Sequence, residues 1–180
     1  MQVFTTDISE DLSLLLKVLS ECENVNGIKF VGFSYHFVNG KLFSILLSSE
    51  ITTICVILNI STIGQIVKLL NDPTWVKIGF NTDDFLDFLK DESIYPNNII
   101  DIKNLLLWGN FNFPKEITFE LLCEKYFYYS SNVVDGSDAF KILYIFKSIS
   151  DPMLEILKKK FSKKPIISRN TLREKKKKYN

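Results

Sequence analysis

Two polar side chains that could take part in chemistry, Ser34 and His36, interrupt the apolar run Phe30–Phe37. This run predicts a β-strand, in which successive side chains point to opposite faces, so both residues are expected on the same face. A neutral imidazole can bind Zn²⁺ or Mn²⁺, although it brings no charge to a metal site. His36 is the only histidine of the chain. A lone histidine on a strand is more often a hydrogen-bonded structural residue than a ligand.

Two carboxylates, those of Asp84 and Asp138, fall near the starts of predicted helices. Such oxygens are the ligands that Mg²⁺ prefers. A carboxylate in a first helical turn also interacts favourably with the helix dipole. Each aspartate therefore has a structural explanation beside the chemical one.

Basic residues gather at the C-terminal end of the chain, where Lys175, Lys176, Lys177 and Lys178 follow one another. The tail fits three roles equally: a solubilising end, a nuclear import signal, or an arm that binds nucleic-acid phosphates. In the last role the binding would be sensitive to salt and blind to sequence.

The composition narrows the class of protein. A length of 180 residues fits one domain, and a net charge of +1 excludes a chain that is basic throughout. Cys22, Cys55 and Cys123 are widely spaced, which predicts reduced thiols and an intracellular protein, cytoplasmic or nuclear. No uncharged apolar run approaches the roughly 20 residues that span a bilayer.

The spacing of apolar residues and the turn signals between apolar segments predict an α/β fold with a mixed sheet. The turn signal Asn39-Gly40 joins the first two strands as a hairpin. Helices are predicted from about residue 8 to 22, from 61 to 70, from 82 to 89, from 105, from 118 to 127, and from about 135 onward. The expected strands are Phe30–Phe37, Lys41–Ser48, Ile51–Leu58, Trp75–Phe80 and Ile99–Ile102.

Four blocks of the sequence carry more than a secondary-structure pattern: Phe30–Phe37, Val76–Phe88, Ile100–Ile102 with Thr118–Phe127, and Ser137–Phe146. In this order, with these elements between them, they resemble the RNase D-like 3′–5′ exonuclease domains of the DEDD type. The resemblance covers about residues 1–150. It implies an RNase H-like fold with a mixed five-stranded sheet flanked by helices.

By this resemblance, four carboxylates that hold catalytic metal ions would stand at positions 34, 36, 84 and 138. Asp84 and Asp138 remain, whereas Ser34 and His36 replace the first Asp and the Glu. The family also places a Tyr or His four residues before its last Asp, where this chain has Val134. Both departures remove parts of the implied catalytic machinery.

A two-metal mechanism would place two cations about 4 Å apart, their charge balanced mainly by the four carboxylates. The two remaining carboxylates, of Asp84 and Asp138, leave much of that charge uncompensated. We therefore expect no cofactor. Asp84 and Asp138 are metal ligands only if a metal binds. An active enzyme with Mg²⁺ or Mn²⁺ would need Asp83, Asp101 or Asp135 as a relocated ligand.

We therefore predict an exonuclease-like domain over residues 1–162 and a basic tail over residues 163–180. The expected function is that of a catalytically degenerate domain that serves as a nucleic-acid-binding or protein-interaction adaptor in a larger complex. A protein partner is expected, RNA or DNA is a possible ligand, and no membrane is expected. One alternative is an active 3′–5′ exonuclease with relocated metal ligands. Another is a scaffold that touches no nucleic acid.

Overall fold

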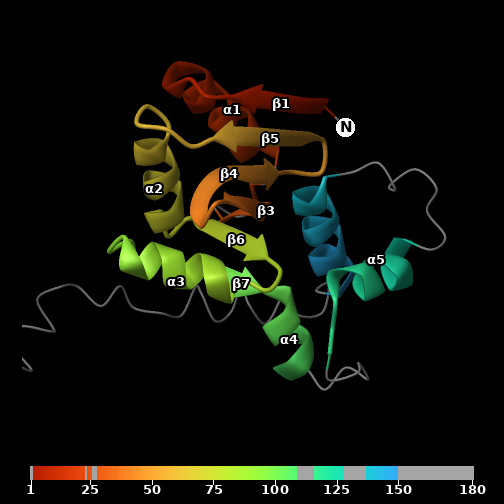
Figure 1. Cartoon of the computed structure of the whole chain (residues 1–180). Helices are drawn as coiled ribbons and strands as arrows, with labels where there is room; N and C mark the ends of the chain where they lie inside the picture. The colour runs from red at the N-terminus through yellow and green to blue at the C-terminus, as the bar shows by residue number, and fades with distance from the viewer. Residues whose placement is uncertain (1, 23, 26–27, 109–115, 128–136, 150–180) are drawn as a thin grey trace, which may run out of the picture. The chain divides into compact units, whose positions relative to one another are not determined.

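The computed structural model of the chain describes residues 2–22, 24–25, 28–108, 116–127 and 137–149. The chain divides into two compact units, Met1–Phe146 and Lys147–Asn180. The sheet and the helices described below belong to the first unit (Figure 1). Within the described residues, no helix combines the length and the apolar character needed to cross a membrane.

A mixed sheet of seven strands forms the centre of the first unit. Its strand order is β1-β5-β4-β3-β6-β7, and β2 pairs with β3 beside this path. Strands β3, β4 and β5 are antiparallel neighbours, whereas β6 and β7 continue the sheet in parallel from β3. The strands are β1 (Gln2–Thr6), β2 (Asn24–Val25), β3 (Ile28–Val38), β4 (Lys41–Ser48), β5 (Thr52–Ile57), β6 (Trp75–Gly79) and β7 (Ile99–Asp101).

Strand β3 presents its two faces to different helices. The rings of Phe33 and Tyr35 lie 5.3 Å and 4.9 Å from the ring of Phe85 on the helix Asp83–Asp91. Two faces alternate along a strand, and the intervening positions contact a helix on the other side. There the ring of Phe30 stacks on that of Phe146 at 6.3 Å. The face that carries positions 34 and 36 is therefore the face of the helix that contains Phe146.

Helices cover both faces of the sheet. The labelled helices are α1 (Ser9–Cys22), α2 (Ile63–Asn71), α3 (Asp83–Asp91), α4 (Ile102–Trp108) and α5 (Phe119–Phe127). On the face of Phe33, the core joins Leu12 and Leu19 from α1, Leu69 from α2, and Phe85 from α3. On the other face lies a last helix, of which residues 138–146 belong to the first unit; it is drawn in blue and without a label in Figure 1.

All five expected strands are present, and the mixed α/β fold is confirmed, but the sheet has seven strands rather than five. The two additional strands are β1 and β2. Strand β1 pairs in parallel with β5 at the edge of the sheet, and Val3 on it is 61% exposed. An exposed edge strand lacks the apolar alternation that identifies a strand in sequence, and β2 is too short for any periodicity.

Candidate functional site

A pocket of about 490 Å³ opens beside Ser34 and Tyr35 within β3 and beyond the carboxyl ends of β6 and β7. We call it the Ser34 pocket. Phe80 and Asn81 directly follow β6, and Lys103 follows β7. Open α/β sheets bind ligands beyond the carboxyl ends of their strands, so this is the place where a binding pocket is expected. Its lining residues are Ser34, Tyr35, Phe80, Asn81, Lys103, Ile117, Thr118, Phe119, Glu120, Asp138 and Ile142.

Ser34 and Asp138, two of the four positions implied by the family resemblance, both line this pocket. Close packing of the last helix on β3 brings them there. A Cβ atom on Gly32 would overlap the carbonyl oxygen of Ala139 and would lie 2.8 Å from Cβ of Leu143. The helix can approach the strand so closely only because position 32 has no side chain.

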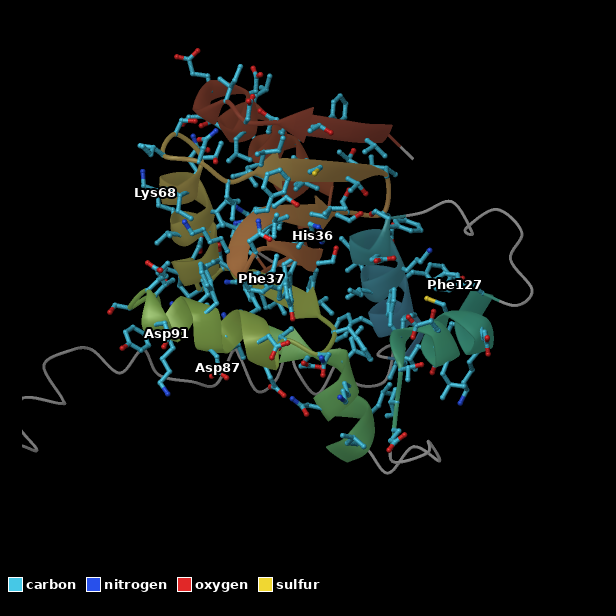
Figure 2. All side chains as sticks on the ribbon, in the orientation of Figure 1. His36, Phe37, Lys68, Asp87, Asp91 and Phe127 are labelled. Atoms are coloured by element: carbon cyan, nitrogen blue, oxygen red, sulfur yellow. The ribbon has the colours of Figure 1, made fainter. Side chains whose placement is uncertain are left out.

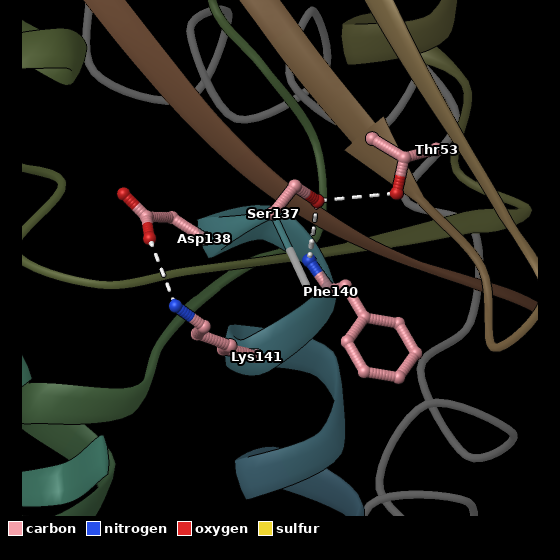
Figure 3. Close-up of polar contacts among 5 residues, drawn as sticks. All are labelled: Thr53, Ser137, Asp138, Phe140 and Lys141. Carbon is pink, nitrogen blue, oxygen red and sulfur yellow. Dashed lines mark hydrogen bonds and ion pairs between the residues drawn. The ribbon is translucent and has the colours of Figure 1, made fainter. Parts of the chain in front are cut away.

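The first turn of that helix is fixed by Ser137. Its hydroxyl accepts the backbone N–H of Phe140 at 3.3 Å and forms a hydrogen bond of 3.1 Å with the hydroxyl of Thr53 (Figure 3). This is an N-cap, so Asp138 is the first residue of the helix. Its carboxylate lies 4.0 Å from the ammonium group of Lys141. The opening of the helix is thereby tied to β5.

His36 and Asp84 are not among the residues that line the Ser34 pocket. His36, labelled in Figure 2, stands on β3 directly opposite Ser44 of β4. Asp84 is exposed in the first turn of α3. Its charge nevertheless acts on a residue of the pocket. Burial raises the pKa of the Tyr35 phenol, and the neighbouring carboxylates of Asp84 and Asp101 raise it further.

Tyr35 and Lys103 are positioned by the loop that follows β6. The phenol of Tyr35 donates a hydrogen bond of 2.8 Å to the backbone carbonyl of Asn81. The ammonium group of Lys103 donates one of 2.9 Å to the side-chain oxygen of the same residue. Asn81 has a φ of 52°, a left-handed conformation that asparagine tolerates better than most residues. This single loop residue therefore orients two of the pocket's polar side chains.

Asp101, which the sequence offered as a relocated metal ligand, connects the starts of α3 and α4 instead. Its Oδ2 atom accepts the backbone N–H of Thr82 at 2.6 Å and the hydroxyl of the same residue at 3.0 Å. Its Oδ1 atom accepts the backbone N–H groups of Lys103 at 2.8 Å and of Asn104 at 3.4 Å. Rotation toward a metal would break these bonds. Of the other two candidates, Asp83 is exposed on α3, and Asp135 lies outside the described residues.

The carboxylates at the Ser34 pocket do not fit a two-metal centre. Asp138 and Glu120 line it, and Asp138 already faces Lys141. In the part of the chain that the structure describes, no three His, Cys, Asp or Glu side chains come together around a possible ion position. A hydroxyl at position 34 adds no negative charge. The two carboxylates that line the pocket therefore balance at most two of the four positive charges of two divalent cations.

Comparison with solved structures establishes the fold. The chain is similar to the exoribonuclease RNase D of Escherichia coli, with a TM-score of 0.62 and 14% sequence identity over 86% of this chain and 44% of that one. The fold is that of a DEDD-type 3′–5′ exonuclease domain. No protein-family model matches the sequence, and no curated protein matches it either.

Two further structures share the exonuclease-like fold. The catalytic core of RRP6 from Trypanosoma brucei gives a TM-score of 0.60 at 15% identity, over 86% of this chain and 48% of that one. The exonuclease domain of EXD2, from a crystal soaked in Mn and GMP, gives 0.51 at 14% identity, over 93% and 98%. This chain spans less than half the length of the RNase D and RRP6 chains.

Several residues of the Ser34 pocket were not anticipated from the sequence. Lys103 follows the aspartate of β7 by two residues, and Phe119 opens α5. The rule that ligands bind beyond the carboxyl ends of strands could have indicated Lys103. Val134 and the lysines at 175–178, which the sequence did single out, lie outside the described residues.

Proposed function

We propose that this protein is a catalytically degenerate exonuclease-like domain that acts as a non-catalytic adaptor in a larger complex. The observation that carries the proposal is the lack of three converging metal-ligand side chains among the described residues. It is supported by Ser34, which stands in the pocket where the family resemblance implies an aspartate. We place the adaptor inside the cell, in the cytoplasm or nucleus, because its widely spaced cysteines fit a reducing compartment.

The chemistry of phosphodiester cleavage explains why loss of these ligands matters. Two metal ions would activate the attacking water and stabilise the leaving oxygen. The protein's part is to hold both ions, and Asp138 with Glu120 supplies at most two negative charges at the Ser34 pocket. Neither the hydroxyl of Ser34 nor the amide of Asn81 replaces a carboxylate as a charge-balancing ligand. The residues of the pocket could therefore bind a ligand but would not hydrolyse a phosphodiester bond.

A labelled-oligonucleotide assay tests the proposal. The full chain, at high concentration with Mg²⁺ or Mn²⁺, is expected to leave single-stranded RNA and DNA intact. The Asp84→Asn variant is the control, since it should behave identically if the chain is inactive. A ladder of shortened products that disappears in Asp84→Asn would instead establish the alternative, an active 3′–5′ exonuclease with relocated ligands.

The converse experiment restores the two missing acids. The double variant Ser34→Asp with His36→Glu is expected to gain Mn²⁺ affinity, because a new carboxylate would join Asp138 at the pocket. It is not expected to gain turnover, since the family's water-orienting Tyr or His is a valine at position 134. Manganese binding measured by electron paramagnetic resonance, beside the nuclease assay, separates these two properties.

A further inference from the structure

We infer that the Ser34 pocket receives a basic segment of a protein partner. An arginine or lysine side chain of that segment would have the rings of Phe80 and Phe119 on one side and the carboxylates of Asp138 and Glu120 on the other. This inference rests on the proposed loss of catalysis and names the class of partner that the adaptor binds. It follows from the mismatch between the pocket's charge and the metals that the fold implies.

The charge around the pocket is negative. Two carboxylates, of Asp138 and Glu120, and one ammonium group, of Lys103, line it, and a second ammonium group, of Lys141, lies 4.0 Å from Asp138. Lys103 is already bonded to the side-chain oxygen of Asn81 at 2.9 Å. Burial raises the pKa of the Tyr35 phenol, which lines the pocket, and the carboxylates of Asp84, Asp101 and Asp83 raise it further, so three more negative charges act on this space.

Outside the pocket the body of the chain is also acidic. On α3, Asp83, Asp87 and Asp91 follow one another at four-residue spacing and are exposed. Asp87 and Asp91 point away from the sheet (Figure 2). Residues 163–180 hold eight of the 22 Lys and Arg residues but one of the 21 Asp and Glu residues, which leaves residues 1–162 with a net charge of −6.

This charge discriminates between two classes of ligand. Bound metal ions would reverse the sign of the field and attract the phosphates of a nucleic acid. Without them, a phosphate entering the Ser34 pocket meets carboxylates, and like charges placed together oppose binding. A cationic side chain meets the complementary charge instead.

The aromatic walls fit the same ligand. The rings of Phe80 and Phe119 lie 5.5 Å apart at 42° to each other, and both residues are partly exposed. An arginine or lysine placed over an aromatic ring is attracted by the ring's quadrupole. A volume of about 490 Å³ is sufficient for such a side chain, since ligand pockets range from about 300 to 1,000 Å³.

Fluorescence anisotropy of a labelled peptide tests this inference on the full chain. The probe is a heptapeptide of alternating glycine and arginine, and its partner probe carries uncharged citrulline in place of arginine. The arginine peptide is expected to bind, and the citrulline peptide to bind more weakly by about tenfold or more. Asp138→Asn and Glu120→Gln should each weaken arginine-peptide binding by about two- to fivefold, the effect of losing one exposed ion pair.

Matched variants separate the pocket from general surface charge. Glu124→Gln removes an exposed carboxylate one turn further along α5, outside the pocket lining, and should leave the affinity unchanged. Phe119→Leu keeps an apolar side chain but removes the aromatic face, and should weaken binding by about two- to fivefold. Circular dichroism of each variant verifies that it is folded.

Three results would overturn the inference. The first is equal binding of the arginine and citrulline peptides. The second is equal weakening by Glu124→Gln and Glu120→Gln. The third is an oligonucleotide that binds less well to Lys103→Gln and better to Asp138→Asn. By contrast, Mn²⁺ binding that is lost in Asp138→Asn would contradict the proposed function itself, so the two failures are distinguishable.

Discussion

Gly32 of β3 lies directly against the backbone of Ala139, so closely that a Cβ atom on the glycine would overlap the carbonyl oxygen. This contact sets how near the last helix comes to the sheet. It therefore determines that Asp138, one residue before Ala139, shares a pocket with Ser34, two residues after Gly32. The absence of a side chain at position 32 thus allows the helix and the strand to approach closely enough to form the Ser34 pocket.

The variant Gly32→Ala is expected to lower the free energy of unfolding by about 1–3 kcal/mol, the usual effect of overpacking a core. The clash is with a backbone atom of a helix, which cannot rotate away as a side chain can. Urea denaturation followed by circular dichroism measures the change.

A matched glycine provides the control for this variant. Gly64, near the start of α2, has no atom within 4 Å of the position that an added methyl group would occupy. Gly64→Ala should raise stability by up to about 1 kcal/mol, because alanine is the better helix former. Equal effects of the two substitutions would contradict the close approach at Gly32.

Replacing Asp101 by asparagine is expected to lower the free energy of unfolding by about 1.5–3 kcal/mol, the range for hydrogen bonds to charged groups. An asparagine side chain has one acceptor oxygen, whereas both oxygens of Asp101 accept hydrogen bonds, from Thr82 and Lys103. The exposed Asp87 of α3 supplies the control. Asp87→Asn should change stability by less than about 0.5 kcal/mol, and a comparable loss in both variants would refute the connecting role.

Lys77 makes stability depend on pH. Its side chain is completely buried and donates hydrogen bonds to the carbonyl oxygens of Asp72 and Trp75, each at 3.0 Å. Burial lowers its pKa from 10.5 to about 8. In the unfolded chain the proton is held up to the ordinary pKa of lysine, so between these pH values the unfolded state binds more protons.

The contribution of Lys77 to stability should consequently rise as the pH increases from about 8 to 10.5, with a slope of at most about 1.4 kcal/mol per pH unit. The measurement is the difference in unfolding free energy between the unmodified protein and Lys77→Met, followed across that range. Lys90→Met, at an exposed position of α3, is the control and should give no such slope. A flat difference for Lys77 would show that its ammonium group is not destabilised in the fold.

Deleting residues 163–180 is expected to abolish any binding of single-stranded oligonucleotides. This segment holds the four consecutive lysines, and phosphate contacts dominate non-specific affinity. The salt dependence, roughly 0.7 in log–log slope for each phosphate contact with a single strand, should disappear with the binding. Filter binding at several salt concentrations measures both.

The arginine peptide serves as the internal control for this deletion. If the Ser34 pocket binds it, the truncated chain should retain peptide affinity while losing oligonucleotides. Undiminished oligonucleotide binding after the deletion would assign nucleic acid to the folded domain instead.

The sequence alone determined the order of the strands β3 to β7 and of the helices between them, because apolar alternation and turn residues act over a few neighbouring positions. The Asn39-Gly40 turn fixed the hairpin of β3 and β4, and the spacing of Ser34 and His36 fixed their common face. It also showed that two of the four implied acids are absent, since residue identity requires no coordinates.

Tertiary structure decided what depends on residues distant in the chain. Strand β1 forms by pairing with β5, and Asp101 connects two helix starts because Thr82, 19 residues away, donates its backbone N–H to it. Lys77 is buried, although its residue type predicts exposure. Asp138 lines the Ser34 pocket because the last helix packs so closely on Gly32, whereas Asp84 stays exposed on α3. Such distances arise from the summed packing of many side chains, which no local pattern encodes.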